Sequence, residues 1–347
     1  MNLILLRSIL TPITIPLSLV YGYIIYLRNV FYDLGWFAAK DFKQPVISVG
    51  NITTGGSGKT PLVMYLANLL IKNGKTPGIV SRGYGRKSQG LVVVHDGKKI
   101  KTKVESAGDE PFLMATILKS VPIIVSENRR EAICHLLKFS TVNIIIMDDG
   151  FQHRRVKRDL DIITISANDS KNDYRLLPWG KLRESLKNIN RSNTIVITKT
   201  DNYNPPNLLA EFQSVFKGKS ILSRISPILM RHDSAGYHKS LPSSKVFFAF
   251  CGIGEPESFF KSIKQLDLTL EGKRIFSDHQ EYTESVITEL SAQIKSSNCT
   301  AIITTEKDFV KLPDNFLDEF ETFVIRVELE FKTEKAILDM IQPLLLK

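Results

Sequence analysis

The chain has 347 residues, and its 43% hydrophobic and 24% charged content is ordinary for a globular protein and excludes a disordered or collagen-like chain. The net charge of +10 predicts anionic partners: phosphates, nucleic acid or acidic lipid. The three cysteines (Cys134, Cys251 and Cys299) lie far apart without a CxxC pair, which excludes a disulfide framework or zinc ribbon and is typical of a reducing compartment. The length, more than twice that of a domain of roughly 150 residues, favours two domains.

The N-terminal segment differs from the rest of the chain. Residues 8–27 carry no charge and are flanked by Arg7 and Arg28, and as a helix they would extend about 30 Å, the thickness of a bilayer core. Nearby aromatic residues are typical of a membrane interface: Tyr21, Tyr23, Tyr26, Phe31, Tyr32 and Trp36. We predict a membrane-anchoring helix within residues 1–31, spanning the bilayer or lying in its interface. One alternative is a cleaved signal peptide, but the apolar part is too long for one and no A-x-A site follows. The other alternative is a buried core helix.

Short apolar runs then alternate with periodic helical segments. The expected strands are 45–49, 78–80, 121–125, 143–147, 160–165 and 194–198, and the expected helices are 61–72, 110–119, 128–139 and 207–216. This alternation predicts a mainly parallel sheet with helices on both faces. Residues 91–94 and 100–104, joined across Asp96-Gly97, predict an inserted β-hairpin.

The most informative segment is 50–60, GNITTGGSGKT, which follows an expected strand and precedes an expected helix. Glycines in such a loop let backbone N–H groups surround phosphate oxygens, the lysine reaches the β- and γ-phosphates, and the final hydroxyl binds Mg²⁺. The candidate nucleotide-binding residues are Thr53, Thr54, Gly55, Gly56, Ser57, Gly58, Lys59 and Thr60. Thr53 stands where the usual pattern has its first glycine. The alternative is a flexible glycine-rich turn.

The partner of such a loop is also present. Residues 144–147 are apolar and are followed by Asp148 and Asp149, so a predicted strand ends in carboxylates that hold Mg²⁺ or its water. Alone, this pattern is also typical of a capped turn. With the phosphate loop it predicts that the chain binds a nucleoside triphosphate on an α/β fold of the P-loop NTPase type.

Segment 230–244 has the composition of a linker, and the alternation of strands and helices restarts beyond it. The expected strands there are 246–250, 268–275, 301–304 and 322–327, and the expected helices are 257–264, 281–294 and 334–346. The predicted organisation is an anchor (1–31), a nucleotide-binding domain (32–230), a linker (231–244) and a smaller α/β domain (245–347) that closes the active-site cleft.

Four further clusters of residues narrow the class of nucleotide-binding protein: 81–86 (SRGYGR), 108–111 (GDEP), 148–155 (DDGFQHRR) and 177–184 (LPWGKLRE). With the phosphate loop, and with 276–279 (FSDH) and 304–308 (TTEKD), the chain resembles the tetraacyldisaccharide 4′-kinase family, the lipid A kinases of Gram-negative bacteria. The resemblance implies transfer of the γ-phosphate of ATP, with Mg²⁺, to the 4′-hydroxyl of a tetraacyl-disaccharide 1-phosphate, forming lipid IVA. It also implies catalytic domains on the cytoplasmic face of the inner membrane. Neither nucleic acid nor an obligate protein partner is expected.

The resemblance also implies roles for individual residues. Asp109 matches the family's base and His279 its partner, with Lys59 as the third catalytic residue. By itself, Asp109 could equally be a helix N-cap and His279 a surface-loop histidine. If both catalytic roles hold, the two residues must meet in a cleft between the domains, which implies closure over ATP.

Charged residues complete the candidate site. Thr60, Asp148, Asp149 and Glu184 are the expected metal ligands, and Arg82, Arg86, Arg154 and Arg183 the expected substrate or phosphate contacts. For Arg183 and Glu184 the alternative is a surface ion pair, and for the basic run 154–158 it is a solvated face or contact with acidic lipid headgroups.

One rival from another class remains, a membrane-associated GTPase or transport-coupled ATPase. Residues 198–201 (TKTD) resemble the guanine-reading motif of GTPases, in which Asp201 would bind the base. Against this, Asp148-Asp149-Gly150 has the wrong spacing for a D-x-x-G switch. A nucleic-acid-binding function rests on the positive charge alone, since no zinc-finger, homeodomain-like or RNP pattern is present.

Overall fold

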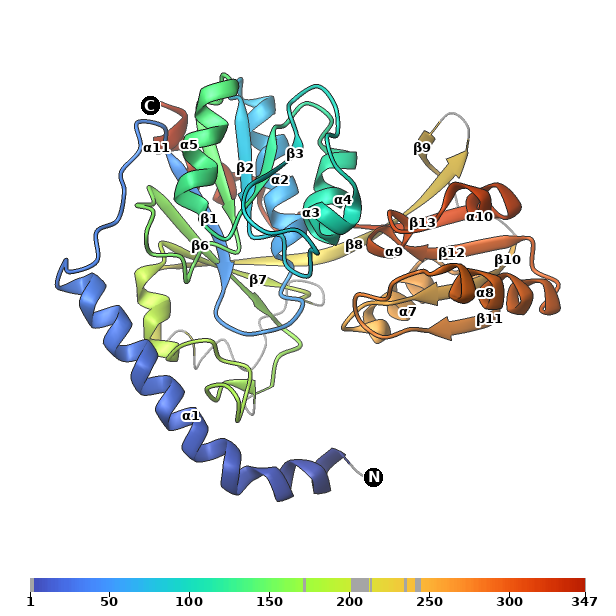
Figure 1. The fold of residues 1–347 in the computed structure, drawn as a ribbon, viewed down its shortest axis with the longest axis horizontal. Helices are drawn as coiled ribbons and strands as arrows, with labels where there is room; N and C mark the ends of the chain where they lie inside the picture. Colours follow the sequence, from blue (N-terminus) through green and yellow to red (C-terminus); the bar gives the residue numbers. More distant parts are fainter. Residues whose placement is uncertain are drawn as a thin grey trace.

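The computed structural model describes residues 3–170, 173–200, 212, 214–233, 236–240 and 245–346. The strands of these residues form one continuous sheet in the order β11-β10-β12-β13-β8-β7-β6-β1-β5-β2-β4-β3, with β9 paired to β8. Figure 1 shows that this sheet runs through two lobes. The first lobe contains the phosphate loop, and the second is built from later residues.

The first lobe contains the mainly parallel sheet that the alternation predicts. Its strands are β1 (Val46–Asn51), β2 (Pro77–Ser81), β3 (Val92–His95), β4 (Ile123–Val125), β5 (Ile144–Asp148), β6 (Leu160–Ser166), β7 (Thr194–Thr198) and the start of β8 (Lys219–Asp233). Only β3 pairs antiparallel among them, with β4. β1, β5 and β6 are buried throughout, as expected for parallel strands covered on both faces.

Helices cover both faces of this lobe. Helices α2 (Lys59–Lys72), α4 (Asp109–Ile117) and α11 (Glu334–Leu345) pack into one apolar core, and α5 (Arg129–Phe139) packs into a second core on the opposite face. The remaining elements are α3 (Val104–Ala107) and the 3₁₀-helix η2 (Leu186–Arg191). The predicted helices 61–72, 110–119 and 128–139 are therefore confirmed. Of the predicted helix 207–216, residues 207–211 and 213 lie outside the described residues, and 212, 214 and 215 are helical.

The predicted hairpin at 91–104 is wrong in its second arm. β3 pairs with β4, and Ile100 makes only an isolated bridge to His95. Val104 begins the short helix α3 instead of ending a strand. The Asp96-Gly97 turn itself is present, since the Asp96 carboxylate accepts backbone N–H groups from Lys98 and Lys99 at 2.8 Å.

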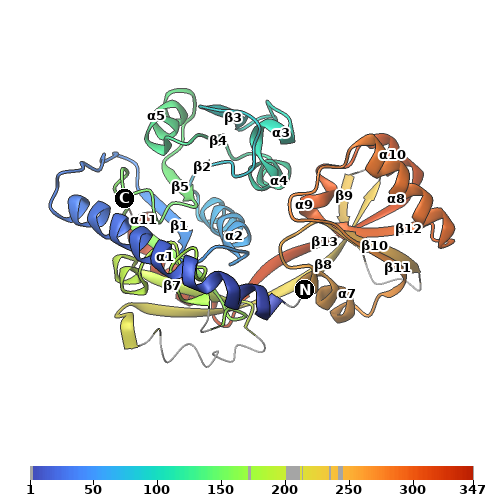
Figure 2. The same cartoon turned by 60° about the horizontal axis from the view of Figure 1, so that its bottom comes forward.

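The predicted linker 231–244 is also wrong where the structure describes it. β8 continues to Asp233 and β9 occupies Gly236–Lys239. β8 pairs with β7 through its first residues and then with β13 (Glu321–Phe331), antiparallel, from Ser223 to His232. The turned view in Figure 2 shows this two-stranded ribbon joining the lobes. A paired ribbon is stiffer than a linker, because its backbone groups are hydrogen-bonded.

The second lobe is a smaller α/β unit. Its parallel strands are β10 (Val246–Cys251), β11 (Thr269–Ile275) and β12 (Ala301–Thr305), next to β13. Its helices are α7 (Pro256–Gln265), α8 (Glu284–Ser296), α9 (Glu306–Phe309) and α10 (Asp314–Glu319). Apolar cores lie on the two faces of this sheet, one against α8 and α10 and one against α7.

The last helix returns to the first lobe, which corrects the predicted boundary at residue 347. Ile337, Ile341 and Leu344 of α11 are buried in the same core as α2, together with Leu329 and Phe331 of β13. The second lobe is therefore inserted between β8 and α11 of the first.

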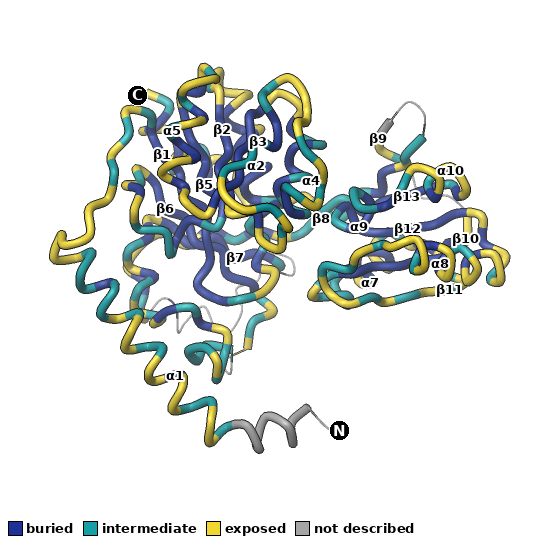
Figure 3. Tube along the Cα trace, viewed as in Figure 1, coloured by how far each residue is buried: buried dark blue, intermediate teal, exposed yellow. Residues whose placement is uncertain are grey.

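Helix α1 (Leu3–Asp33) lies along the outside of the first lobe (Figures 1 and 2). Its segment Thr11–Asp33 is long and apolar enough to cross a membrane, by length and composition, with a mean hydropathy of 1.2. One side is exposed through the apolar residues Ile13, Leu17, Leu19, Val20 and Ile24 (Figure 3). Ser18 and Asn29 are buried against the body, so the helix has two different faces.

Candidate active site

The phosphate loop connects β1 to α2, and its glycines are required by its shape. Gly58 is the N-cap of α2 with φ +80°, and a Cβ there would lie 3.0 Å from the Thr198 side chain. Gly55 has φ +115°. Both conformations strongly favour glycine. The loop thus delivers the positive end of α2 and Lys59 to one point, which is the arrangement that binds phosphate groups.

Lys59 faces Asp149. Its Nζ lies 3.6 Å from Asp149 Oδ1, and Arg183 Nη1 lies 3.0 and 3.1 Å from the two carboxylate oxygens of the same residue. Burial would raise the pKa of Asp149, but the charges of Lys59 and Arg183 outweigh it and lower the pKa. Asp149 is therefore a carboxylate held between two cations, and the structure brings Arg183 to the site as predicted.

Asp148 is in the opposite electrostatic state. Its Oδ2 accepts a hydrogen bond from Ser81 at 2.8 Å, while its Oδ1 is buried without a hydrogen-bond partner. Burial, together with the nearby carboxylates of Glu110 and Asp149, raises the pKa of Asp148 to about 6. A buried oxygen of this kind accommodates a cation.

Glu110 is the site residue that the sequence analysis missed. Its carboxylate lies within hydrogen-bonding reach of Thr60, pairs with Lys307 and is close enough to Lys59 to feel its charge. Burial would raise the pKa of Glu110, but Lys307 and Lys59 lower it to about 2. The sequence did contain an indication that Glu110 belongs to the site, because it follows Asp109 directly in the GDEP cluster.

These oxygens fit Mg²⁺. The described residues contain no group of three or more His, Cys, Asp or Glu side chains arranged as a closed metal cage. Mg²⁺ usually takes one or two carboxylates and completes its shell with nucleotide phosphates and water. Thr60, Glu110 and Asp148 meet that requirement, with the unpartnered Asp148 Oδ1 as the clearest indication.

Asp109 and His279 meet across the lobes, as the predicted roles require. His279 Nδ1 lies 3.0 Å from Asp109 Oδ2, and Lys311 Nζ lies 3.4 Å from the same oxygen. Asp109 is the first residue of α4, whose cap position is Gly108, so its side chain is not an N-cap. His279 has φ +58°, an uncommon backbone conformation for a residue other than glycine.

The two charges of this pair stabilise each other. The hydrogen bond to Asp109 raises the pKa of His279 against the effect of burial. Burial would raise the pKa of Asp109, but His279 and Lys311 lower it. The pair is therefore favoured as imidazolium and carboxylate, with His279 hydrogen-bonded to Oδ2 and Lys311 close to the same oxygen.

Other ion pairs form between the two lobes. Lys307 pairs with Glu110, Lys199 Nζ lies 2.5 Å from Glu255 Oε2, and Lys87 Nζ lies 2.8 Å from Glu281 Oε1. Lys199 belongs to the TKTD segment, and Asp201, the residue that would read guanine, lies outside the described residues. Each of these pairs joins a residue of the first lobe to one of the second.

Glu184 does not have the predicted metal-binding arrangement. Arg191 binds both of its oxygens at 2.9 Å, and Asn29 and Asn188 donate to Oε2 at 3.1 and 2.8 Å. Its side chain is fully buried. Because protein donors already occupy both oxygens of this carboxylate, Glu184 is not expected to bind the metal.

Two residues predicted to contact phosphate, Arg154 and Arg86, instead form contacts within the protein. Arg154 Nη2 lies 2.6 Å from Asp33, and its guanidinium stacks 4.9 Å from the Tyr32 ring, at the end of α1. Arg86 binds Glu127 and the carbonyl of Gly90, which fixes its own loop. Neither guanidinium is free for a substrate.

A cationic group surrounds His153 beyond the Asp148-Asp149 pair. Burial, followed by the charges of Arg129, Arg158, Arg155 and Arg82, lowers the pKa of His153 to about 4. His153 Nε2 is buried and has no hydrogen-bond partner among the described residues. Arg82 is exposed, whereas Arg183 is paired with Asp149, so of the predicted phosphate contacts Arg82 is the one that remains available.

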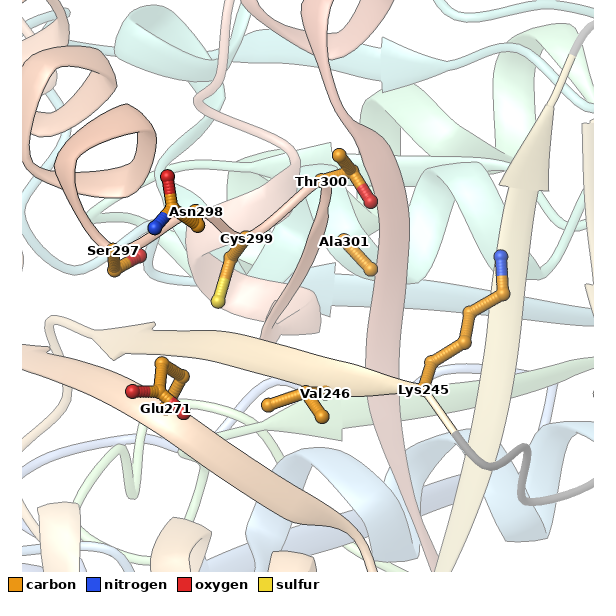
Figure 4. Close-up of a pocket in the computed structure, with 8 residues that line it drawn as sticks. All are labelled: Lys245, Val246, Glu271, Ser297, Asn298, Cys299, Thr300 and Ala301. Carbon is orange, nitrogen blue, oxygen red and sulfur yellow. The ribbon is translucent and has the colours of Figure 1, made fainter.

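A separate cavity of about 500 Å³ lies in the second lobe, lined by residues that include Lys245, Glu271 and Cys299 (Figure 4). It opens at the Ala301 end of β12, whereas Lys307 and Lys311 follow the other end of that strand. The cavity is therefore not part of the site described above.

The phosphate loop, the paired carboxylates and the parallel sheet define a P-loop nucleotide-binding enzyme, with a second lobe that brings His279 to Asp109. The model of the tetraacyldisaccharide-1-P 4′-kinase family matches residues 10–345, and the chain belongs to that family. It is 37% identical over 339 residues to the tetraacyldisaccharide 4′-kinase of Desulfotalea psychrophila, covering 94% of this chain and 95% of that one. It is 38% identical over 306 residues to that of Chlorobaculum parvum, covering 86% and 84% of the two chains.

A solved structure gives the same result. The "apo" form of LpxK from Aquifex aeolicus in complex with ATP superposes with a TM-score of 0.77 at 33% identity, covering 98% of this chain and 99% of that one. The likeness extends over both lobes and α1, so the whole arrangement is that of the family.

Proposed function

We propose that this chain is an ATP-dependent kinase that transfers the γ-phosphate of ATP to the 4′-hydroxyl of a tetraacyl-disaccharide 1-phosphate, in lipid A biosynthesis. The observation that carries the proposal is the Asp109–His279 pair at 3.0 Å, one residue from Glu110, which reaches Thr60 of the phosphate loop. This juxtaposition would put a base beside the triphosphate site. A kinase that uses a sugar hydroxyl needs this juxtaposition, and an NTPase switch does not.

The roles of the residues follow from their positions. Lys59 and the N-terminus of α2 bind the phosphates and neutralise charge that develops during transfer. The Asp109 carboxylate accepts the proton of the attacking hydroxyl; His279 and Lys311 both contact Oδ2, so Oδ1 is the oxygen that would receive it. His279 orients Asp109 and stabilises its charge.

Mg²⁺ fits the oxygens at the end of β5 and the start of α4. Thr60, Glu110 and Asp148 would hold it, and it would neutralise the phosphate oxygens of the nucleotide. Lys307 pairs with Glu110 in this structure. If Glu110 held Mg²⁺ instead, Lys307 would become available to other anions on the same side of the cleft.

The 1-phosphate end of the substrate fits the cationic group around His153. Arg82, Arg129 and His153 provide donors there, and His153 Nε2 lacks a partner. A phosphate group would supply the negative charge that these residues lack.

The exposed apolar side of α1 fits a lipid surface. Because the helix lies along the body from Ser18 to Asn29, lipid can reach only its outer side there, which favours a helix in the interface over one that spans the bilayer. We place the enzyme on the cytoplasmic face of the inner membrane, where ATP and an acylated disaccharide are both accessible.

The direct test is phosphate transfer from [γ-³²P]ATP to a 1-phosphorylated tetraacyl disaccharide in detergent micelles. Label in the lipid from the wild type, nearly lost in Asp109→Ala and His279→Ala, is the expected result. Asp318→Ala and His135→Ala, which change exposed residues of the same types, serve as controls and should retain transfer. Absence of lipid labelling by the wild type, with hydrolysis of GTP instead, would overturn the proposal.

A further inference from the structure

Besides its contacts with Arg154, helix α1 is hydrogen-bonded to residues 176–184, which we term the bridging loop. Ser18 Oγ donates to the Leu176 carbonyl at 2.9 Å, and Tyr21 Oη donates to the Arg183 carbonyl at 2.6 Å. Gly22 lies so close to this loop that an added Cβ would be 2.7 Å from Leu176 Cδ1. The inward face of α1 is therefore fitted to the loop and is not merely in contact with it.

The other side of the bridging loop is paired with the phosphate loop. The Thr54 N–H donates to the Lys181 carbonyl and the Arg183 N–H donates to the Ile52 carbonyl, both at 2.8 Å. Thr53 and Leu182 form an antiparallel bridge between these two bonds. The bridging loop thus lies between α1 and the nucleotide-binding backbone.

Arg183 connects the two sides. Its carbonyl accepts from Tyr21, its N–H donates to Ile52, and its guanidinium bridges both oxygens of Asp149. Asp149 in turn lies 3.6 Å from Lys59. Within the described residues, a single residue therefore joins the lipid-facing helix to the phosphate-binding lysine.

We propose that Tyr21 is a positioning residue for phosphoryl transfer: its hydroxyl fixes the main chain of Arg183, and through the Arg183 guanidinium it fixes Asp149 and Lys59. The inference rests on the proposed nucleotide site but goes beyond anchoring, since it makes α1 part of the catalytic framework. Ser18 and Asn29 support the same contact from either side of Tyr21.

The chemistry of the contact suits this role. Burial raises the pKa of Tyr21, so the phenol is a protonated donor at neutral pH. Removing its hydroxyl leaves the Arg183 carbonyl without that donor and releases the bridging loop on one side. Small displacements of positioning groups reduce rates strongly, because phosphoryl transfer depends on alignment.

The test compares Tyr21→Phe with Tyr23→Phe and Tyr26→Phe in the full-length chain. All three remove one phenol hydroxyl from α1, but Tyr23 and Tyr26 are mostly exposed, at 63% and 62%. Four quantities are measured for each variant: kcat, KM for MgATP, melting temperature and co-sedimentation with phosphatidylglycerol-containing vesicles.

The expected result is a fall in kcat/KM for MgATP of roughly three- to tenfold in Tyr21→Phe only, the loss of one hydrogen bond. Co-sedimentation should match the controls, and the melting temperature should be lower by no more than a few degrees, the loss of one hydrogen bond. In an Arg183→Met background, the same substitution should have no further effect on kcat/KM, because the connection to Asp149 is already broken.

Three results would overturn the inference: wild-type kinetics in Tyr21→Phe, an equal loss in the two control variants, or an undiminished loss in the Arg183→Met background. Failure of the proposed function looks different, because the wild type itself would then fail to phosphorylate the acceptor. Binding of MgATP to the wild type and Tyr21→Phe, measured by calorimetry, tests the same inference without the acceptor lipid.

Discussion

His279 Nδ1 and Asp109 Oδ2 are 3.0 Å apart although the residues are 170 positions apart in the chain and belong to different lobes. The two side chains come from different lobes, so the carboxylate that we propose as the base is oriented by a residue of the second lobe. The ribbon of β8 and β13 keeps that lobe in register. We therefore expect any separation of the lobes to leave the proposed base without its partner.

This pair predicts a specific titration. The hydrogen bond to Asp109 raises the pKa of His279 above 6.5, and in Asp109→Asn that pKa should fall, because burial then acts without the carboxylate. The stabilisation from His279 is complete below pH 6.5 and is lost as the pH rises through the raised pKa. NMR titration of the histidine ring checks this, and identical pKa values in both proteins would contradict it.

Glu110→Gln should raise the Mg²⁺ concentration needed for half-maximal transfer by about tenfold or more, since a charged metal ligand is replaced by a neutral one. The measurement is transfer rate against free Mg²⁺ at saturating ATP. Glu105→Gln, an exposed change five residues earlier, is the control and should leave the Mg²⁺ dependence unchanged. An unaltered Mg²⁺ dependence in Glu110→Gln would remove this residue from the metal set.

Lys311→Met should destabilise the protein by about 3 kcal/mol, because the side chain is only 9% exposed and its loss leaves Asp308 and Asp109 without a shared cation. Urea unfolding followed by circular dichroism measures the change. Lys311→Arg should recover part of the loss, and Lys335→Met, at an exposed position, should have little effect. Equal stability of Lys311→Met and wild type would show that this cation is dispensable.

His153 should titrate near pH 4 in the free enzyme, because it is buried among arginines. As the pH falls from 6.5 toward 4, the folded state should lose stability relative to His153→Gln, since only the unfolded state then takes up the proton readily. Binding of the 1-phosphorylated acceptor should raise this pKa by supplying negative charge. A pKa that is the same with and without the acceptor would place the phosphate elsewhere.

Leu17→Asp combined with Val20→Asp should abolish co-sedimentation with lipid vesicles, because a charge on the outer side of α1 opposes burial in the interface. The matched control is Ile275→Asp, which places a charge at an exposed apolar position of the second lobe. Vesicle binding that survives the double change would exclude the outer side of α1 as the lipid contact.

The local signals in the sequence are strong enough to locate the nucleotide site. The phosphate loop, the strand ending in Asp148-Asp149 and the helices with 3.6-residue periodicity all depend on near neighbours in the chain. The family resemblance, not the local pattern, supplied the pairing of Asp109 with His279, and the structure brings those two residues together.

What the sequence could not provide depends on distant partners. Residues 219–233 read as a mixture of polar and apolar positions because this strand passes from one lobe to the other and changes its surroundings along its length. Glu184 and Arg154 have the charge expected of ligands, but α1 uses both, through Asn29 and Asp33. Nothing near them in the chain indicates that an N-terminal helix lies there.

The return of α11 to the first lobe has a consequence for biosynthesis. The twelve-residue α11 carries apolar side chains that complete the core around α2, so this core stays open until α11 has been synthesised. The second lobe precedes α11 in the chain, so we expect it to be able to fold first, against the usual N-to-C order of domain folding during translation. The nucleotide-binding lobe, although it begins earlier in the chain, would then complete its core after the second lobe.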